Sequence, residues 1–460
     1  MRGSTVHPVS SLLIKHATVL ATMDDAGTEI DDGGLYAVDG WIEQVGPTSD
    51  LPDHADEVLD LSGHVVLPGL INTHHHFYQT LTRAVPGAQD AALFDWLRAL
   101  YPIWERITPQ DVSLSTQVAL AELALSGCTT SSDHLYLYPN GSSFADQVEA
   151  AEAIPLRVHL ARGSMSLGES AGGLSPDSVV EDEDVILAET QQAIETFHDP
   201  KPGAMVRVVV APCSPFTVTT DLMREAAALA RAYGVHLHTH VAETLDEEQF
   251  CFGLCGMRPV ELMEDLGWAG DDVWYAHGVF VDDAEIARMA AAGTGVAHCA
   301  TSNMRLASGI GPLSKYLDAG VRTGLGVDGS ASNDGSHLLG EVRQAMLLAR
   351  LAAAGEEGPF LSARDALRVA TTGSAAVLGR TDVGSLEPGK AADFTAISLD
   401  RIGYAGAQHD PLAAVIFTAP VNVDHTYVHG RAVVSDGEVV GIELPRLLER
   451  HNAAANRLLG

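Results

Sequence analysis

A chain of 460 residues is long enough for one large barrel with additions or for two or three smaller domains. Its 61 Asp and Glu against 27 Lys and Arg give a formal net charge of -34, so nucleic acid and anionic membranes are poor partners because their phosphates would be repelled. We also expect no membrane span and a cytoplasmic location, because no segment approaches ~20 uninterrupted apolar residues and the five cysteines are too scattered for a disulfide framework.

The first segment of the chain has the pattern of a small β-sheet. From about residue 11 to residue 67, short β-branched runs are broken by turn pairs such as Asp39-Gly40 and Ser62-Gly63. The same pattern returns near the end of the chain, in residues 392–399 and 425–442. We therefore expect residues 1–67 and 381–460 to pair into one composite β-sandwich domain that also carries a C-terminal helix.

Between these two segments, residues 68–380 alternate between strand and helix about eight times. Eight such repeats over roughly 300 residues predict an α/β protein with a closed (β/α)8 TIM barrel, not an open doubly wound sheet. The absence of a glycine-rich phosphate loop after the first strand also disfavours a dinucleotide-binding fold. The predicted strands are 70–74, 128–134, 156–161, 206–211, 235–240, 273–277, 295–298 and 321–327.

Metal-ligating residues stand at the ends of three of these strands, where a TIM barrel carries its reactive groups. His74 and His76 are two residues apart on an extended chain, so both can face one ion, and His240 and Asp328 end the fifth and eighth strands. Imidazole and carboxylate groups suit Zn²⁺, and a catalytic site keeps one position for water. A single His at a strand end is more often a hydrogen-bonded core or surface residue than a metal ligand. Here, metal-compatible residues coincide at the ends of the first, fifth and eighth strands, with acid/base candidates beside them, and this coincidence favours a metal site.

We expect one divalent metal ion per chain, zinc in the first place and iron as the alternative. A second ion would need a bridging group such as a carboxylated lysine, and the fourth strand ends in Ala211-Pro212-Cys213 with no lysine nearby. Glu243 follows His240 by three residues and can move a proton beside the ion, and His277 ends the sixth strand as a second acid or base.

Six segments resemble the amidohydrolase superfamily, and more narrowly its aminohydrolase branch. Within that branch, residues 77–83, 161–170 and 302–309 are most similar to the 8-oxoguanine deaminases and to the related hydroxydechloroatrazine ethylaminohydrolases. The resemblance covers nearly the whole chain. Its segments are Pro68-Gly69-Leu70-Ile71-Asn72-Thr73-His74-His75-His76, His238-Thr239-His240-Val241-Ala242-Glu243, Ala276-His277-Gly278, Ser302-Asn303, Gly326-Val327-Asp328-Gly329 and Leu386-Glu387-Pro388-Gly389-Lys390-Ala391-Ala392-Asp393.

The resemblance implies a role for each residue of the predicted site. By this resemblance, His74, His76, His240 and Asp328 bind the metal. Glu243 takes a proton from the attacking water and passes it to a ring nitrogen, while His277 and Asp328 hold the nucleophile and help to protonate the departing ammonia.

Four residues are implied as substrate contacts, namely Gln79, Trp96, Cys213 and Asn303. Gln79 matches the glutamine that guanine deaminases offer to their purine, whereas Cys213 stands where those enzymes carry an arginine, which disfavours plain guanine. The expected reaction is deamination of a purine-like small molecule, 8-oxoguanine to urate plus ammonia. Triazine or pterin aminohydrolases, guanine deaminase and a non-catalytic metal-binding barrel are the alternatives, and we expect a homo-oligomer.

Overall fold

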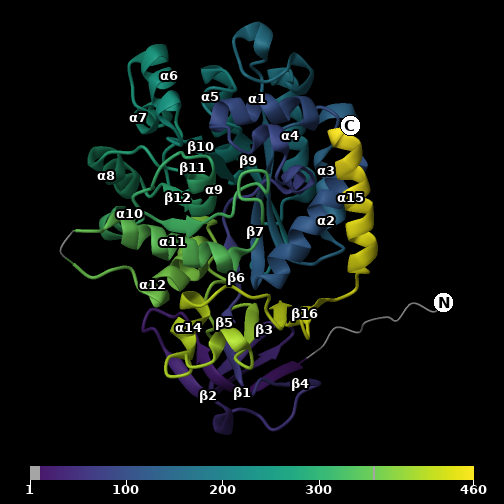
Figure 1. Ribbon diagram of the computed structural model, residues 1–460, viewed down its shortest axis with the longest axis vertical. Helices are drawn as coiled ribbons and strands as arrows, with labels where there is room; N and C mark the ends of the chain where they lie inside the picture. The colour runs from purple at the N-terminus through teal and green to yellow at the C-terminus, as the bar shows by residue number, and fades with distance from the viewer. Residues whose placement is uncertain (1–10, 356–357) are drawn as a thin grey trace.

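The computed structural model describes residues 11–355 and 358–460, and its centre is a closed barrel of eight strands (Figure 1). Each strand pairs in parallel with its neighbours, and the circle closes where β13 pairs with β6. The (β/α)8 fold class is therefore confirmed. The barrel strands are β6 (Leu70–Asn72), β7 (Cys128–Leu135), β8 (Arg157–Ser164), β9 (Val206–Pro212), β10 (His236–Val241), β11 (Val273–His277), β12 (Gly295–His298) and β13 (Thr323–Leu325).

The helices of the barrel begin and end at the capping residues that the sequence contains. Thr108 and Asp111 form a capping box at the start of α2, and Gly234, Gly293 and Gly320 end three helices in the left-handed conformation that favours glycine. The helices are α1 (Leu93–Trp104), α2 (Pro109–Leu125), α3 (Phe144–Ala151), α4 (Glu183–Phe197), α5 (Thr220–Tyr233), α6 (Leu245–Cys255), α7 (Pro259–Asp265), α8 (Asp283–Ala292), α9 (Ala300–Arg305), α10 (Leu313–Ala319), α11 (Leu338–Ala352), α12 (Ala363–Arg368) and α13 (Ser374–Val377).

Strands from both ends of the chain form a second sheet beneath the barrel (Figure 1). β5 and β14 pair antiparallel from Pro68 with Phe394 to His64 with Ser398, and this ladder joins the two ends. The strands are β1 (Ser11–Ala21), β2 (Glu29–Val38), β3 (Trp41–Pro47), β4 (Glu57–Asp60), β5 (His64–Pro68), β14 (Phe394–Ser398), β15 (His425–Val428), β16 (Arg431–Ser435) and β17 (Glu438–Val439). The division of the chain after residues 67 and 380 stays a prediction, and residues 1–10 lie outside the described part.

Two further helices and several short turns complete the structure. α14 (Pro411–Phe417) lies beside the second sheet, and α15 (Leu444–Leu459) returns to the barrel and packs along α2 (Figure 1). The short helices are η1 (Thr48–Asp50), η2 (Phe77–Thr82), η3 (Pro86–Ala88), η4 (Pro139–Gly141), η5 (Glu169–Ala171), η6 (Asp177–Val179), the π-helical η7 (Val369–Gly373) and η8 (Ile402–Tyr404). In the described part of the chain, no helix is long and apolar enough to cross a membrane.

The first and last barrel strands are shorter than the sequence predicts. β6 ends at Asn72 and not at His74, yet the backbone beyond it still bonds to both neighbouring strands. Thr73 N–H donates to Leu325 O at 2.8 Å, and His134 N–H donates to His75 O at 2.8 Å. These bonds keep the segment with His74 extended, so it still reaches the C-terminal end of the barrel.

Candidate active site

Four predicted metal ligands come together at the C-terminal end of the barrel. Asp328 Oδ1 lies 3.2 Å from His74 Nε2 and 3.3 Å from His76 Nε2, and His76 Nε2 lies 3.2 Å from His240 Nε2. All four side chains are buried, with at most 9% of the residue exposed. Residues from three separate barrel elements therefore point their ligating atoms at one small volume.

Two of the imidazoles have their tautomers set by backbone carbonyls. His76 Nδ1 donates to His134 O at 2.6 Å, and His240 Nδ1 donates to Cys213 O at 2.5 Å. A neutral imidazole carries one N–H, so both Nε2 atoms carry lone pairs and cannot donate to each other. Two lone pairs 3.2 Å apart in a buried site are the arrangement that a cation between them stabilises.

The third imidazole is oriented through another histidine. His238 Nδ1 donates to Trp274 O at 3.0 Å, so its Nε2 accepts the proton of His74 Nδ1 at 2.8 Å. His74 Nε2 is then a lone pair facing Asp328, and it has no hydrogen-bond partner among the described atoms. This donor set, three imidazole nitrogens and one carboxylate oxygen, fits a divalent ion such as zinc.

The charge states of these groups also suit a metal. Burial lowers the pKa of His240 to about 3 and the pKa of His74 well below its usual value, so both rings are neutral. Burial alone would raise the pKa of Asp328, but the surrounding imidazoles of His74, His277 and His76 hold that pKa well below the ordinary range. Neutral imidazoles and an ionised carboxylate are the forms that bind Zn²⁺.

The second oxygen of Asp328 is held by two serine hydroxyls. Ser302 Oγ donates to Asp328 Oδ2 at 2.6 Å, and Ser332 Oγ donates to the same atom at 3.1 Å. His277 Nε2 lies 3.9 Å from this oxygen. Oδ1 thus faces the imidazoles while Oδ2 faces the remaining polar groups of the site.

Glu243 and His277 form an acid/base pair beside the ligand cluster. Glu243 Oε2 lies 3.5 Å from His277 Nε2, and both side chains are almost fully buried. Burial raises the pKa of Glu243 above its usual value, and burial of His277 is outweighed by the carboxylates of Glu243 and Asp328, which raise the pKa of that imidazole. The shift of Glu243 moves its pKa toward neutrality, where proton transfer by such a group is most effective.

A pocket adjoins these groups, and His76, His240, Glu243, His277 and Asp328 are among the residues that line it. Three of the four predicted substrate contacts line it, namely Gln79, Trp96 and Cys213. Asn303 does not line it: this residue lies behind His277 and accepts a hydrogen bond from His277 Nδ1 at 3.0 Å. The remaining wall is mainly aromatic and aliphatic, from Leu93, Leu97, Tyr101, Tyr136, Phe216 and Leu306.

The predicted contacts are held in place around the cavity. Trp96 Nε1 donates to Ala331 O at 3.1 Å, which pins the indole against the loop after β13. A Cβ at Gly329 would lie 1.8 Å from Gln79 Oε1, so the glutamine amide occupies space that only glycine leaves free. Burial raises the pKa of the Cys213 thiol to about 12, so it faces the cavity as a neutral group.

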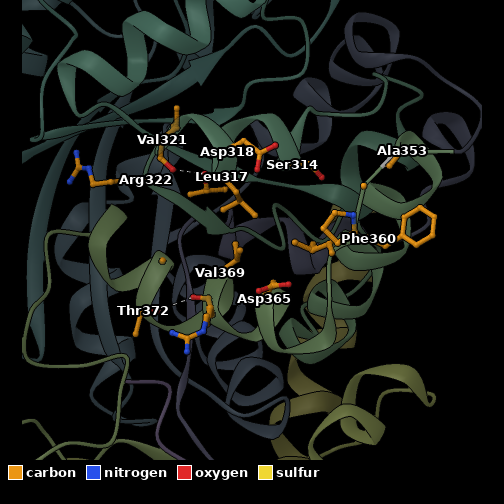
Figure 2. Close-up of a pocket in the computed structure, with 16 residues that line it drawn as sticks. Ser314, Leu317, Asp318, Val321, Arg322, Ala353, Phe360, Asp365, Val369 and Thr372 are labelled. Atoms are coloured by element: carbon orange, nitrogen blue, oxygen red, sulfur yellow. Dashed lines mark hydrogen bonds between the residues drawn. The ribbon is translucent and has the colours of Figure 1, made fainter. Parts of the chain in front are cut away.

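A second hollow lies away from this cluster, between α10, α12 and η7 (Figure 2). Asp318, Arg322, Phe360 and Asp365 are among its lining residues, and none of the predicted site residues is. The Arg322 guanidinium is already used by carbonyl groups, including Ala376 O at 3.0 Å. The chemistry predicted from the sequence therefore belongs to the cavity at the C-terminal ends of the strands.

Several residues of the site were not predicted from the sequence. His134 is the penultimate residue of β7; its Nε2 donates to Ala211 O at 2.8 Å, and its Nδ1 has no hydrogen-bond partner among the described atoms. One ligating atom from each of His74, His134 and His240 lies within 4.8 Å of the others. The signal for His134 was its place at the end of a predicted strand, whereas Ser332 and Tyr101 had no signal of this kind.

Comparison with known proteins identifies the family. Residues 65–433 match the Amidohydrolase family. The chain belongs to that family. It is 48% identical to an 8-oxoguanine deaminase from Pseudomonas aeruginosa over 430 residues, 93% of this chain and 95% of that protein. It is also 40% identical to the hydroxydechloroatrazine ethylaminohydrolase of Pseudomonas sp. strain ADP, over 96% of this chain and 94% of that protein.

Solved structures of related proteins are similar to this chain over almost its whole length. The crystal structure of an atrazine chlorohydrolase from Arthrobacter aurescens TC1, complexed with zinc, superposes with a TM-score of 0.92. The two sequences are 36% identical, over 96% of this chain and 100% of the other. The family resemblance expected from the motifs is confirmed.

Proposed function

We propose that this chain is a metal-dependent aminohydrolase that deaminates 8-oxoguanine to urate and ammonia. One observation carries the proposal: three imidazole lone pairs and a carboxylate converge beside the Glu243–His277 pair, at a pocket that both members of this pair line. The 48% identity to an 8-oxoguanine deaminase over almost the whole of both chains supports the choice of ring.

We assign one divalent ion, zinc in the first place and iron as the alternative, to His74, His76, His240 and Asp328. When bound, such an ion lowers the pKa of a water molecule toward 7 and so supplies a nucleophile at neutral pH. A binuclear site would need a bridging group, and the end of β9, Ala211-Pro212-Cys213, offers no lysine.

Glu243 has the role of proton shuttle. Its carboxylate accepts a proton from the attacking water and delivers it to the ring nitrogen next to the amino-bearing carbon, which makes that carbon electrophilic. His277 and Asp328 Oδ2 orient the nucleophile and return a proton to the leaving amine, so that water and the C–NH₂ group become a carbonyl and ammonia. We assign Asn303 to positioning, because it accepts the Nδ1 proton of His277 and leaves Nε2 facing the centre.

The cavity wall supports an uncharged heterocycle as substrate. Among the described residues that line it there is no Arg or Lys, so a phosphate group would meet no cationic Arg or Lys side chain. Gln79 offers an amide to the ring edge, Trp96 offers an aromatic wall, and the neutral Cys213 thiol stands beside His240.

A second candidate is removal of an amine from a triazine or a pterin. It is supported by the 40% identity to hydroxydechloroatrazine ethylaminohydrolase and the 35% identity to an isoxanthopterin deaminase. The same metal and acid/base groups would serve these rings, since the chemistry at the amino-bearing carbon is alike.

Ammonia release from a substrate panel tests the proposal. Metal-replete enzyme would be assayed with 8-oxoguanine, guanine, isoxanthopterin and an aminotriazine, with His240→Ala as the inactive control. We expect the highest kcat/KM for 8-oxoguanine, with urate as the product. A higher value for the pterin or the triazine would replace the substrate assignment, and ammonia release from none would contradict the proposed reaction.

Metal content tests the mononuclear assignment. Elemental analysis is expected to find one tightly held divalent ion per chain. Two ions per chain, with activity dependent on both, would contradict it. The expected cytoplasmic location and homo-oligomeric state stay predictions.

A further inference from the structure

A second buried carboxylate holds the loop that carries Glu243. Glu247 lies in the first turn of α6 and is fully buried. Its Oε1 accepts the backbone N–H of Ala242 at 2.8 Å, and its Oε2 accepts the backbone N–H of Glu243 at 2.8 Å. We propose that Glu247 is a positioning residue that fixes the Glu243 carboxylate at the reacting centre. The inference rests on the role proposed above for Glu243.

The backbone at this point needs an external constraint. Ala242 has a φ of 56°, in the left-handed region that a residue with a Cβ rarely adopts. This conformation turns the chain back immediately after β10 and brings Glu243 next to His277. The Ala242 carbonyl accepts the N–H groups of Val279 and Phe280 at 2.8 and 2.9 Å, while Glu247 holds its N–H. The Ala242 carbonyl is therefore hydrogen-bonded to the loop after β11, and the Ala242 N–H is hydrogen-bonded to Glu247.

The bonds of Glu247 differ from those of a helix cap. Thr244 is the N-cap of α6 and Glu247 is the third residue of the helix, so an ordinary capping box would join Glu247 to the Thr244 N–H. Instead, the carboxylate reaches one and two residues further back, to Glu243 and Ala242. Its two oxygens are thus committed to the catalytic loop and not to the end of the helix.

The chemical cost of this arrangement also favours a role in positioning. No Lys or Arg forms an ion pair with Glu247 in the described part of the chain, and burial raises the pKa of its carboxyl to about 7. Replacement of buried ionic groups by apolar side chains of similar volume is often neutral or stabilising, so stability alone does not account for a carboxyl at this position. Two parallel N–H bonds to one carboxylate, in contrast, restrict both the place and the direction of the peptide between Ala242 and Glu243.

The test compares Glu247→Gln with Asp246→Asn in the metal-loaded enzyme. Asp246 lies in the same helical turn but is exposed, so its variant removes the same charge without touching the loop. The Glu247→Gln variant keeps one oxygen that can accept a backbone N–H. Its amide NH₂ group then faces the other backbone N–H, so that hydrogen bond is lost. We expect kcat to fall by about 10- to 100-fold, because a shift of about 1 Å in a reacting group costs on that order. KM should stay within about twofold and the metal content should be unchanged. Asp246→Asn should resemble the parent.

Amide hydrogen exchange supplies a readout that does not depend on turnover. The peptide containing residues 242–247 should exchange faster in Glu247→Gln than in the parent or in Asp246→Asn. If Glu247→Gln does not fold, Glu247→Asp withdraws the carboxylate by one methylene and should give the same direction of change in both measurements. Unchanged exchange in a folded variant would overturn the proposal, as would an unchanged kcat.

The double variant Glu243→Gln/Glu247→Gln separates this inference from the proposed function. If Glu247 acts only through Glu243, the double variant should be no slower than Glu243→Gln alone. A further loss of the same size as in the single variant would overturn the positioning role. Parent-like activity of Glu243→Gln would instead contradict the proposed shuttle, while the hydrogen-exchange comparison would still decide whether Glu247 holds the loop.

Discussion

At the scale of single residues, the site depends on which nitrogen of each imidazole carries the proton. Carbonyl groups of His134, Cys213 and Trp274 decide this for His76, His240 and, through His238, His74. Each of these carbonyls belongs to a neighbouring barrel strand or to the loop that follows it, so the closed barrel itself orients the metal ligands. Such outer partners typically matter almost as much for affinity as the ligands they orient.

Glu243→Gln and His240→Ala should separate proton transfer from metal binding. Glu243 faces His277 and lies outside the four-ligand cluster, so its amide variant should keep the metal and lose about 10²- to 10⁴-fold in kcat. His240→Ala removes a ligand and should empty the site. Elemental analysis measures the metal content of the two variants, and ammonia release measures their activity. Loss of metal from Glu243→Gln would make Glu243 a ligand and contradict its assignment as proton shuttle.

Substitution of Cys213 should change substrate preference and not metal binding. Its thiol lines the cavity, whereas its contact with His240 Nδ1 at 2.5 Å is made by the backbone carbonyl, which Ala or Ser retains. We expect the parent to prefer 8-oxoguanine over guanine by at least tenfold in kcat/KM, about 1.4 kcal/mol, and Cys213→Ala to erode that preference. Cys255→Ala, at an exposed position, is the control. An unchanged preference in Cys213→Ala would assign discrimination to another residue.

At the scale of elements, the C-terminal helix supports the active-site wall. α15 packs along α2 and η2, and His451 Nε2 bonds to Thr80 Oγ1 at 3.0 Å, next to Gln79. Amphipathic packing explains its orientation: Leu447, Ala454 and Leu458 are buried. The helix thus ties the end of the chain to the segment that follows the first metal ligands.

Adjacent leucines in α15 give a matched test of this packing. Leu458 is fully buried and Leu459 is 47% exposed. Leu458→Ala should lower the free energy of unfolding by about 2–5 kcal/mol, because it removes buried methyl groups and leaves a cavity. Leu459→Ala should change it by less than about 0.5 kcal/mol. Urea unfolding of the two variants measures the difference, and equal effects would mean that α15 does not pack as described.

At the scale of the whole molecule, the two ends of the barrel have different tasks. The C-terminal ends of the strands carry the ligands, whereas Arg157 at the start of β8 forms a buried pair with Asp393 beside β14, at 2.6 Å. Arg380 and Asp382 form a second buried pair at 2.7 Å near the same junction. The second sheet therefore anchors the barrel at the end opposite the chemistry, as the division of roles in TIM barrels leads one to expect.

The net charge of -34 should make stability depend on salt. Like charges repel in the folded state, and the screening length falls from about 30 Å at 0.01 M to about 10 Å at 0.1 M ionic strength. We therefore expect Tm to rise between these concentrations of NaCl, with metal held constant, before the general effects of concentrated salt set in. A Tm that is level or falls over this range would show that self-repulsion does not limit stability.

The sequence by itself determined the barrel, the pairing of the two chain ends and the convergence of His74, His76, His240 and Asp328. The alternation of strands and helices can be read from patterns among neighbouring residues. The C-terminal ends of all eight strands in a TIM barrel lie at the same end of the barrel, so residues at those ends come together. Only the tertiary structure decided what surrounds those residues. In the structure, Asn303 lies behind His277, and the hydroxyls of Ser302 and Ser332 both donate to one oxygen of Asp328. The Glu247 carboxylate accepts a hydrogen bond from the loop that carries Glu243. These contacts depend on loop paths and side-chain directions, which neither periodicity nor spacing along the chain specifies.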